Sequence, residues 1–212
     1  MQIAFDVGNV LVEVDFDEFF MEFKRLGVRE DPFTFLCDIQ ARQDIGIKTL
    51  KVSLKARFGL SEGQVSRLIE AWNNSIKPDD EMLDFVEELE AEGTKIAIMS
   101  NMGSEHVSHI RNAFPSIFEG RRLHLSSEVG ARKPTKIYYQ SFLMQHPHFV
   151  GSIFLDDREE NVEMAKEFGF DARKFELSEF KKLSSSERKE KLNTIKGDVF
   201  KQLLHGSKKC RP

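Results

Sequence analysis

The segment QIAFDVGNVLVEVD, residues 2–15, decides the fold class of this chain. A short apolar run leads into Asp6, and a Gly8-Asn9 pair separates it from a second apolar run. Such a pattern predicts a buried β-strand that ends in a turn. In open α/β sheets, ligands bind at the carboxyl ends of the strands. Asp6 is therefore placed to act as a nucleophile, as a metal ligand or as a cap of the next element.

The composition is typical of a globular protein of moderate size. The 212 residues are 40% hydrophobic and 31% charged, enough for one α/β domain with an insertion or for two small domains. No run approaches the roughly 18 apolar residues of a membrane span, and Met1 leads directly into the first predicted strand without a signal-peptide pattern. We therefore expect a cytoplasmic protein with no membrane association. Cys37 and Cys210 suggest neither a disulfide framework nor a CxxC metal site, so we expect two reduced thiols.

Charge is distributed unevenly along the chain. Ten of the 31 Lys and Arg residues, but three of the 35 Asp and Glu residues, lie within residues 181–212. A basic tail can bind nucleic acid or a membrane surface. We expect instead a solvated terminal helix with a frayed end, and no nucleic-acid partner. The sequence does not indicate an oligomeric state.

The chain divides into an all-helical segment and an alternating segment. Between residues 16 and 76, apolar residues recur at helical spacing and Gly or capping residues separate the runs, which predicts four helices and no strand. Farther on, helical runs alternate with short apolar strands such as KIAIM at 95–99. This alternation predicts a parallel sheet with helices on both faces. We predict a doubly wound α/β core with a helical cap inserted after strand one; the core comprises residues 1–14 and 78–212, and the cap residues 15–77.

Polar side chains follow three of the predicted strands. In a doubly wound sheet these strand ends lie side by side, and Lys133, before Pro134, brings a cation to the same edge. Grouped carboxylates repel one another by about 4 kcal/mol at roughly 4 Å and an effective dielectric of about 20, so they need a cation. Oxygen ligands with open positions suit Mg²⁺. The side chains concerned are Asp6, Ser100, Asn101, Asp156 and Asp157.

Four motifs in this order, FDVGNVL, IAIMSN, RKP and FLDDREENV, resemble those of the haloacid dehalogenase (HAD) superfamily. Most members of that superfamily are Mg²⁺-dependent phosphatases and phosphomutases with a Rossmann-like core. The helical segment between the first two motifs is similar to the family's helical-bundle cap. The opening FDVGNV is similar to that of bacterial sugar-phosphate phosphatases acting on glucose 1-phosphate. The resemblance therefore implies a Mg²⁺-dependent phosphohydrolase that cleaves a small phosphorylated metabolite, sugar phosphate-like, through an aspartyl-phosphate.

The resemblance also implies roles for individual residues. Asp6 would be the nucleophile, Ser100 would hydrogen-bond the transferring phosphoryl group, and Lys133 would neutralise the nucleophile and the phosphate. Asp156 would lie close to the metal or act on it through water, and Asn161 would brace the same loop. The implied direct ligands of Mg²⁺ are Asp6, Asp157 and the backbone carbonyl of Gly8.

Substrate contacts are expected from the core and from the cap. In the cap, the helical pattern breaks at Gln43, Asp44 and Gly46, where related caps carry a loop over the substrate, so Asp44 is a candidate contact. In the core, the expected contacts are Ser100, Asn101 and Lys133.

Two further groups of residues could belong to the site, but we expect both to be structural. His106 and His109 follow Ser100 at helical spacing, and we expect them to be partly exposed helix residues rather than metal ligands. The run of Phe16, Phe19, Phe20 and Phe23, together with Trp72, resembles an aromatic platform for a substrate, but its helical spacing predicts cap core.

Gly8 departs from the family pattern. Phosphatases of the family usually carry there a second Asp that acts as general acid and base, and loss of such a group costs about 10²- to 10⁴-fold in rate. We favour a leaving group that needs little protonation, such as an anomeric sugar phosphate; the alternatives are a proton donor from the cap or a weak catalyst. A protein that binds phosphate or a metabolite without turnover is the rival function. The metal-free dehalogenase branch is disfavoured, because the first motif of those enzymes resembles DxYGT and has an aromatic residue at the position of Gly8.

Overall fold

Five parallel strands form the central sheet of the computed structural model, which describes residues 1–206, and side chains for residues 1–202. The strand order is β5, β4, β1, β6, β7. The predicted doubly wound α/β sheet is confirmed, and Cys210 lies outside the described residues. The bounds are β1 Gln2–Phe5, β4 Lys95–Ser100, β5 Arg122–Leu125, β6 Ile153–Asp156 and β7 Asp171–Lys174.

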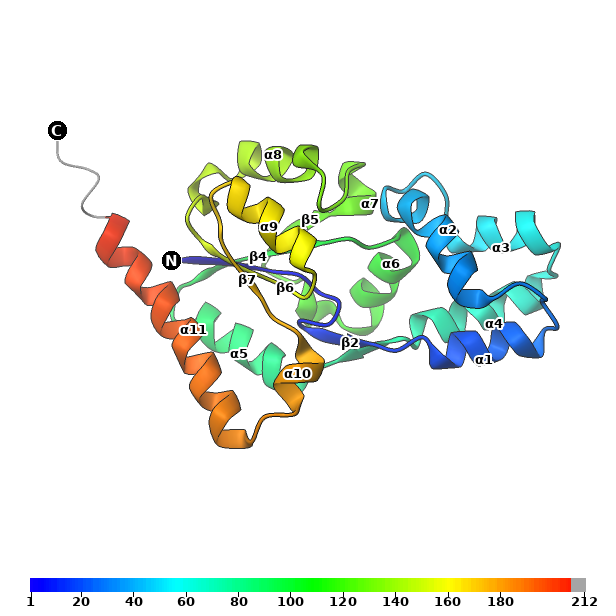
Figure 1. Cartoon of the computed structure of the whole chain (residues 1–212), viewed down its shortest axis with the longest axis horizontal. Coiled ribbons are helices and arrows are strands. Elements are labelled where there is room, and N and C mark those ends of the chain that lie inside the picture. Colours follow the sequence, from blue (N-terminus) through cyan, green and yellow to red (C-terminus); the bar gives the residue numbers. More distant parts are fainter. Residues whose placement is uncertain (207–212) are drawn as a thin grey trace.

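Helices cover both faces of the sheet (Figure 1). Side chains alternate along each strand, so Ile3 and Phe5 of β1 face one apolar cluster while Ala4 faces the other. The Ile3 side packs against α5 (Asp80–Ala91), α6 (Ser104–Ala113), α10 (Leu177–Lys181) and α11 (Ser185–Gly206). The Ala4 side packs against α8 (Lys136–Gln145) and α9 (Glu159–Glu167). Three short helices complete the core: η1 Pro115–Ile117, α7 Ser126–Val129 and η2 Pro147–Phe149.

The C-terminal helix α11 is part of the core and not the solvated helix expected from its charge. Its apolar face is buried against the sheet through Leu192, Ile195 and Val199. Basic residues on it pair with acidic residues of α5, and Arg188 Nε lies 2.7 Å from Glu81 Oε2. The excess positive charge therefore serves in part to dock the helix on an acidic neighbour. None of the helices described combines the length and the apolar character needed to cross a membrane.

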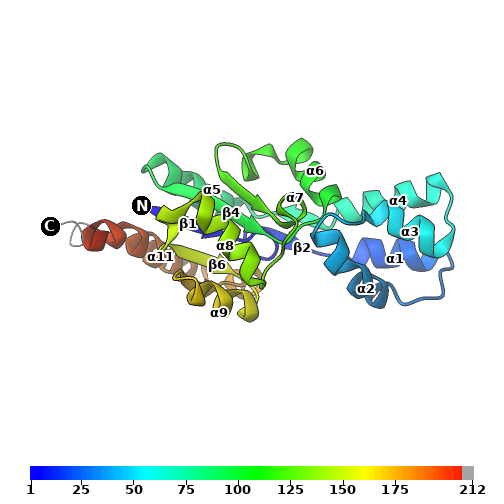
Figure 2. The same cartoon turned by 90° about the horizontal axis from the view of Figure 1, so that it is seen from above.

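The four helices predicted between residues 16 and 76 are present, and we refer to them as the cap: α1 Asp17–Arg25, α2 Pro32–Asp44, α3 Leu50–Phe58 and α4 Glu62–Asn73. Two of them begin at N-capping side chains, since Asp31 accepts a hydrogen bond from the Thr34 amide at 2.8 Å and Ser61 forms a capping box with Gln64. In Figure 2 the cap lies at one end of the molecule, opposite the end that holds the last turns of α11.

A two-stranded antiparallel ribbon joins the cap to the core. It consists of β2 (Val12–Val14) and β3 (Ile76–Pro78), which pair through Val12 with Pro78 and Val14 with Ile76. Neither strand was predicted from the sequence. Strand β7 was not predicted either, because the segment DARK lacks an apolar run. The ribbon places the two chain crossings between core and cap side by side.

Gly46, which follows α2, brings the backbone of the cap close to that of the core. Its φ is +73°, and a Cβ atom on this residue would lie 2.7 Å from the backbone oxygen of Ser127 in α7. Gly27, also in the cap, has a φ of +72° with no atom within 4 Å of such a Cβ. The two glycines thus share one backbone conformation and differ in their surroundings.

We predict that Gly46→Ala destabilises the protein more than Gly27→Ala. The positive φ alone costs about 1 kcal/mol in each variant, and Gly46→Ala must also displace a backbone carbonyl, for a total loss of about 2 kcal/mol or more. Urea unfolding of the two variants measures the difference. Equal losses would contradict the close backbone approach at this seam.

Candidate active site

The central strands bring three of the predicted groups to one edge of the sheet. β1 lies between β4 and β6, with Phe5 paired to Ile98 on one side and to Leu155 on the other. At the carboxyl ends of these strands, Asp6 directly follows β1, Ser100 ends β4 and Asp156 ends β6. All three side chains are buried. Parallel strand pairing therefore assembles residues that lie up to 150 positions apart in the chain, from Asp6 to Asp156.

Lys133 lies at the centre of this group and is fully buried. Its Nζ donates to Asp156 Oδ2 at 2.6 Å and to the Met99 carbonyl at 2.7 Å, and lies 3.1 Å from Asp6 Oδ2. Burial lowers the pKa of Lys133, but attraction to Asp156 and Asp6 outweighs it and the pKa is raised. The ammonium group is therefore charged, and its three N–H bonds all have acceptors.

Asn101 holds the backbone of Lys133 in place. Its Oδ1 accepts from the Lys133 amide and its Nδ2 donates to the Lys133 carbonyl, each at 2.8 Å. This two-point pairing fixes the loop that carries the lysine to the end of β4. Asn101 was predicted to contact the substrate, and it does line the cavity described below, but its amide is engaged with the protein.

Asp156 is saturated with hydrogen bonds from the protein. One oxygen accepts from Lys133, and the other accepts from the Arg158 amide and from Asn161 Nδ2, both at 2.9 Å. The bond from Asn161 is a brace of the kind predicted for it. Asp156 thus orients the lysine and the start of α9, and its oxygens have little capacity left for a metal ion.

Asp157 and Asn9 form a second pair beside Asp6. Asp157 Oδ2 accepts from Asn9 Nδ2 at 3.1 Å, and Asn9 Oδ1 accepts from the Val14 amide at 3.3 Å. Asn9 has a φ of +55°, which Asn tolerates better than most residues. From the sequence, Asn9 was predicted only as a turn residue, and its contact with Asp157 was not predicted. The Gly8-Asn9 turn was the available signal.

The three carboxylates of this cluster carry more negative charge than the single ammonium of Lys133 balances. Oxygen atoms of Asp6, Asp156 and Asp157 lie within 4.8 Å of one another. Burial raises the pKa of Asp6 to about 7; Lys133 lowers it, while the other two carboxylates raise it further. Burial also raises the pKa of Asp157. A divalent cation would reverse these shifts, and the oxygens available on Asp6 and Asp157 are the hard ligands that Mg²⁺ prefers. The donor set therefore fits Mg²⁺.

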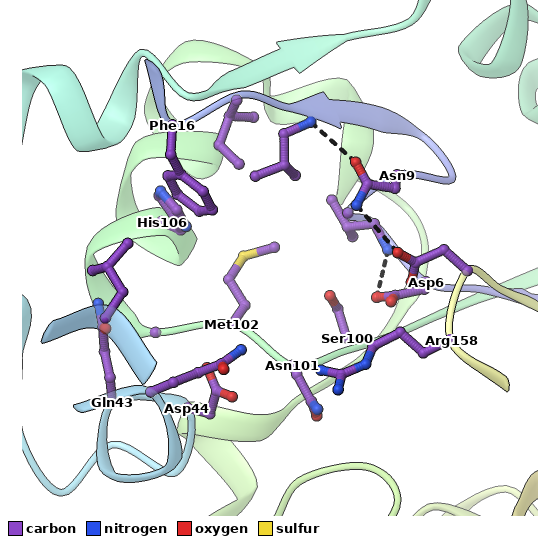
Figure 3. A pocket seen from close by; sticks show the side chains of 18 of the residues that line it. Asp6, Asn9, Phe16, Gln43, Asp44, Ser100, Asn101, Met102, His106 and Arg158 are labelled. Atoms are coloured by element: carbon purple, nitrogen blue, oxygen red, sulfur yellow. Dashed lines mark hydrogen bonds between the residues drawn. The ribbon is translucent and has the colours of Figure 1, made fainter. Parts of the chain in front are cut away.

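The cap contributes a buried carboxylate, Asp44, to the same place. Asp44 ends α2, and its Oδ2 lies 3.4 Å from Arg132 Nη2. Burial raises the pKa of Asp44 to about 6, although Arg132 and Arg158 act to lower it. Figure 3 shows Asp44 beside Asn101, facing the space in front of Ser100. The candidate cap contact thus reaches the core site.

Core and cap enclose a cavity of about 310 Å³ in front of Asp6. Figure 3 shows Asp6, Asn9 and Ser100 on one side of it, and Phe16 and His106 on the other. The Phe run was predicted to be cap core, and all four residues pack in the apolar cluster of the cap. Phe19 and Phe23 are fully buried, whereas Phe16 and Phe20 are partly buried and also line the cavity.

His106 is buried at the seam and not partly exposed as expected. Its ring stacks on Trp72 with centroids 4.5 Å apart and planes at 1°, and its Nε2 donates to the Trp72 carbonyl at 2.9 Å. Burial lowers the pKa of His106 to about 4, so the ring is neutral at pH 7. Helical spacing does not reveal this contact, because the tryptophan belongs to the cap. His109 is partly exposed, as expected.

Comparison with known proteins places these features in context. No family model matches the sequence. A sesquiterpene phosphatase, astK, of Aspergillus oryzae is 26% identical over 119 residues, which cover 55% of this chain and 60% of the relative. The chain thus spans less than two thirds of the length of that relative.

Solved structures share the architecture over most of the chain. A HAD family enzyme from Bacteroides thetaiotaomicron, in complex with magnesium and inorganic phosphate, is 24% identical, with a TM-score of 0.71 over 82% of this chain and 92% of that one. A HAD-like hydrolase from Porphyromonas gingivalis is 21% identical, with a TM-score of 0.63 over 82% and 90%. An L-2-haloacid dehalogenase is 16% identical, with a TM-score of 0.58 over 81% and 83%. The chain therefore has the fold of the HAD enzymes, which is the fold that the resemblance of its four motifs implies.

Proposed function

We propose that this protein is a Mg²⁺-dependent phosphatase that hydrolyses a small phosphomonoester through an aspartyl-phosphate on Asp6. The observation that carries the proposal is the buried Lys133 ammonium, 3.1 Å from Asp6, within a carboxylate cluster whose charge and ligands suit a divalent cation. The phosphatase relative and the HAD enzyme in complex with magnesium and phosphate support the activity and the cofactor.

The first step is attack of an Asp6 oxygen on the phosphorus, with cleavage of the bond between phosphorus and the leaving oxygen. Lys133 holds the Asp6 carboxylate in place and favours its ionised form. Ser100, which hydrogen-bonds Asp6, offers a hydroxyl donor beside the attacked phosphoryl group. Mg²⁺, held by Asp6, Asp157 and the Gly8 carbonyl, would supply the positive charge that lets a carboxylate approach a phosphate dianion.

The leaving oxygen also needs a proton, which Gly8 cannot provide. We propose that Asp44 donates it from the cap and, in the second step, accepts a proton from the water that attacks the aspartyl-phosphate. Three features support this assignment: Asp44 lines the same cavity as Asp6, it is buried, and its pKa is raised toward neutrality. Among the alternatives that Gly8 leaves open, the structure thus favours the cap donor.

Phosphate release tests the proposed function. We expect wild-type protein to release phosphate from at least one member of a panel of sugar phosphates, nucleotides and an aryl phosphate, with Mg²⁺ and not with EDTA. Asp6→Asn should lower the rate by at least about 10³-fold, because it removes the nucleophile. Asp84→Asn, at an exposed position on α5, is the matched control. Chloride release from 2-haloacids would indicate the dehalogenase reaction, and Mg²⁺-dependent phosphate binding without turnover would favour the rival binding function.

We expect Asp156 to be needed for stability and Asp157 for metal binding, so variants of the two residues should behave differently. Asp156→Asn places an amide NH₂ against a donor in either orientation, and we expect a loss of about 3–5 kcal/mol in the free energy of unfolding. Asp157→Asn keeps an acceptor for Asn9 and should change stability by less than about 1 kcal/mol. Thermal unfolding with and without Mg²⁺ measures both: stabilisation by Mg²⁺ should disappear in Asp157→Asn. Equal destabilisation by the two variants would contradict the separate roles.

Asp44→Asn tests whether Asp44 is the general acid. In the wild type, kcat for an alkyl phosphate should fall as pH rises above about 6, because the donor must be protonated and its pKa is raised to that value by burial. In Asp44→Asn this limb should be absent and kcat lower by about 10²- to 10⁴-fold. The first step with 4-nitrophenyl phosphate, whose leaving group needs no proton, is followed as the pre-steady-state burst of 4-nitrophenolate and should slow less than about tenfold. A similar slowing of the burst and of alkyl phosphate turnover would indicate a structural role instead.

A further inference from the structure

The cavity wall that faces the carboxylates across the site is apolar. In Figure 3, Phe16 lies across the cavity from Asp6, and Met102 lies between them. A group attached to a phosphate at Asp6 must therefore extend along this wall. The apolar side chains that form it come mainly from the cap: Phe16, Phe20, Phe33, Leu36, Trp72 and Met102.

Stacked rings make this wall rigid and poor in hydrogen-bonding groups. Phe16 stacks on Trp72, with centroids 4.7 Å apart and planes at 18°, and His106 stacks on the other side of the same indole. The Nε2 donor of His106 is already used by the Trp72 carbonyl. A sugar hydroxyl placed against these rings would lose its water without gaining a partner, which is unfavourable.

Apart from the indole of Trp72, the polar side chains that the cap places at the cavity come from the last turns of α2; they are Gln40, Gln43 and Asp44. The indole N–H of Trp72 is buried and has no hydrogen-bond partner among the described residues. Gln43 and Asp44 are more than nine-tenths buried, and the Gln43 side chain packs against Gly103 of the core. These groups can serve the phosphate and the leaving oxygen, but they do not extend along the aromatic wall.

Apolar side chains at the cavity that the protein leaves exposed indicate where a ligand binds. Phe33 remains 64% exposed at the start of α2 although it lines the cavity, and Phe16, Phe20 and Leu36 are half-buried. Large apolar side chains that gather at a concave site commonly mark a binding surface, and a ligand's hydrocarbon would cover them.

We propose that the substrate is the phosphomonoester of an apolar alcohol or phenol, whose hydrocarbon part packs against Phe16, Phe33 and Trp72. The proposal rests on the proposed phosphatase function and deepens it. It differs from the sugar phosphate that the sequence resemblance predicts. The cavity volume of about 310 Å³ suits a small hydrocarbon group rather than a polymer or a nucleic acid.

A series of n-alkyl phosphates from methyl to octyl tests the proposal, because its longer members share nearly the same leaving-group pKa. We expect kcat/KM to rise about threefold per added methylene, as burial of apolar surface predicts, until the chain fills the cavity. Glucose 1-phosphate and glucose 6-phosphate are measured alongside and should be poorer substrates than octyl phosphate. Binding of the matching n-alkylphosphonates, which cannot be hydrolysed at the same bond, is measured with Mg²⁺ by calorimetry and should tighten by a similar factor.

Two exposed cap positions give a matched pair of variants. Phe33→Gln removes part of the apolar wall, whereas Met21→Gln changes a residue on α1 that is 65% exposed and lies outside the cavity lining. We expect Phe33→Gln to lower kcat/KM for octyl phosphate by about tenfold, as for a lost apolar contact, and to leave methyl phosphate unchanged. Met21→Gln should change neither.

The outcomes separate this proposal from the function on which it rests. Phosphate release that needs Asp6 and Mg²⁺ but shows no chain-length dependence, or prefers glucose phosphates, would overturn the apolar substrate and leave the phosphatase in place. No release from any ester, with phosphonate binding that still tightens with chain length, would overturn the phosphatase and support the apolar ligand. No release and no dependence of binding on chain length would overturn both.

Discussion

The buried ammonium of Lys133 lies between the carboxylates of Asp6 and Asp156 and contacts both. Asp156 and the Met99 carbonyl accept two of its hydrogens, and the third points to Asp6. A charge buried in this way is tolerated only when paired and fully hydrogen-bonded. The strand order therefore matters energetically, because only adjacent ends of β1, β4 and β6 can supply these acceptors together.

The same arrangement connects the core site to the cap. Asn9 pairs with Asp157 through one side of its amide and with the first strand of the ribbon through the other. Asp44 and Arg132 meet from the opposite direction, at the seam where Gly46 approaches Ser127. The carboxylate cluster and the cap are thus linked at two places, so the position of the cap affects the geometry around Asp6.

Much of the core could be predicted from the sequence, because the apolar runs that end at Asp6, Ser100 and Asp156 can be recognised as strands from their local sequence alone. The cap helices were predictable for a similar reason, since their boundaries lie in local residues such as Asp31 and Ser61. The rest depends on contacts between distant segments. The ribbon pairs strands of three residues some 60 positions apart, and helical spacing alone cannot tell that Phe19 faces the cap interior while Phe16 faces the cavity. The burial of His106 was not predicted for the same reason, because its stacking partner Trp72 lies in the cap.

The stack of Trp72 on His106 has a consequence for observing this protein. Trp72 is the single tryptophan of the chain, and it sits on α4 of the cap while its stacking partner belongs to α6 of the core. Opening of the cap would separate the two rings and expose the indole to water. The tryptophan fluorescence of the unlabelled protein therefore originates entirely at the seam between cap and core, where it reports their separation.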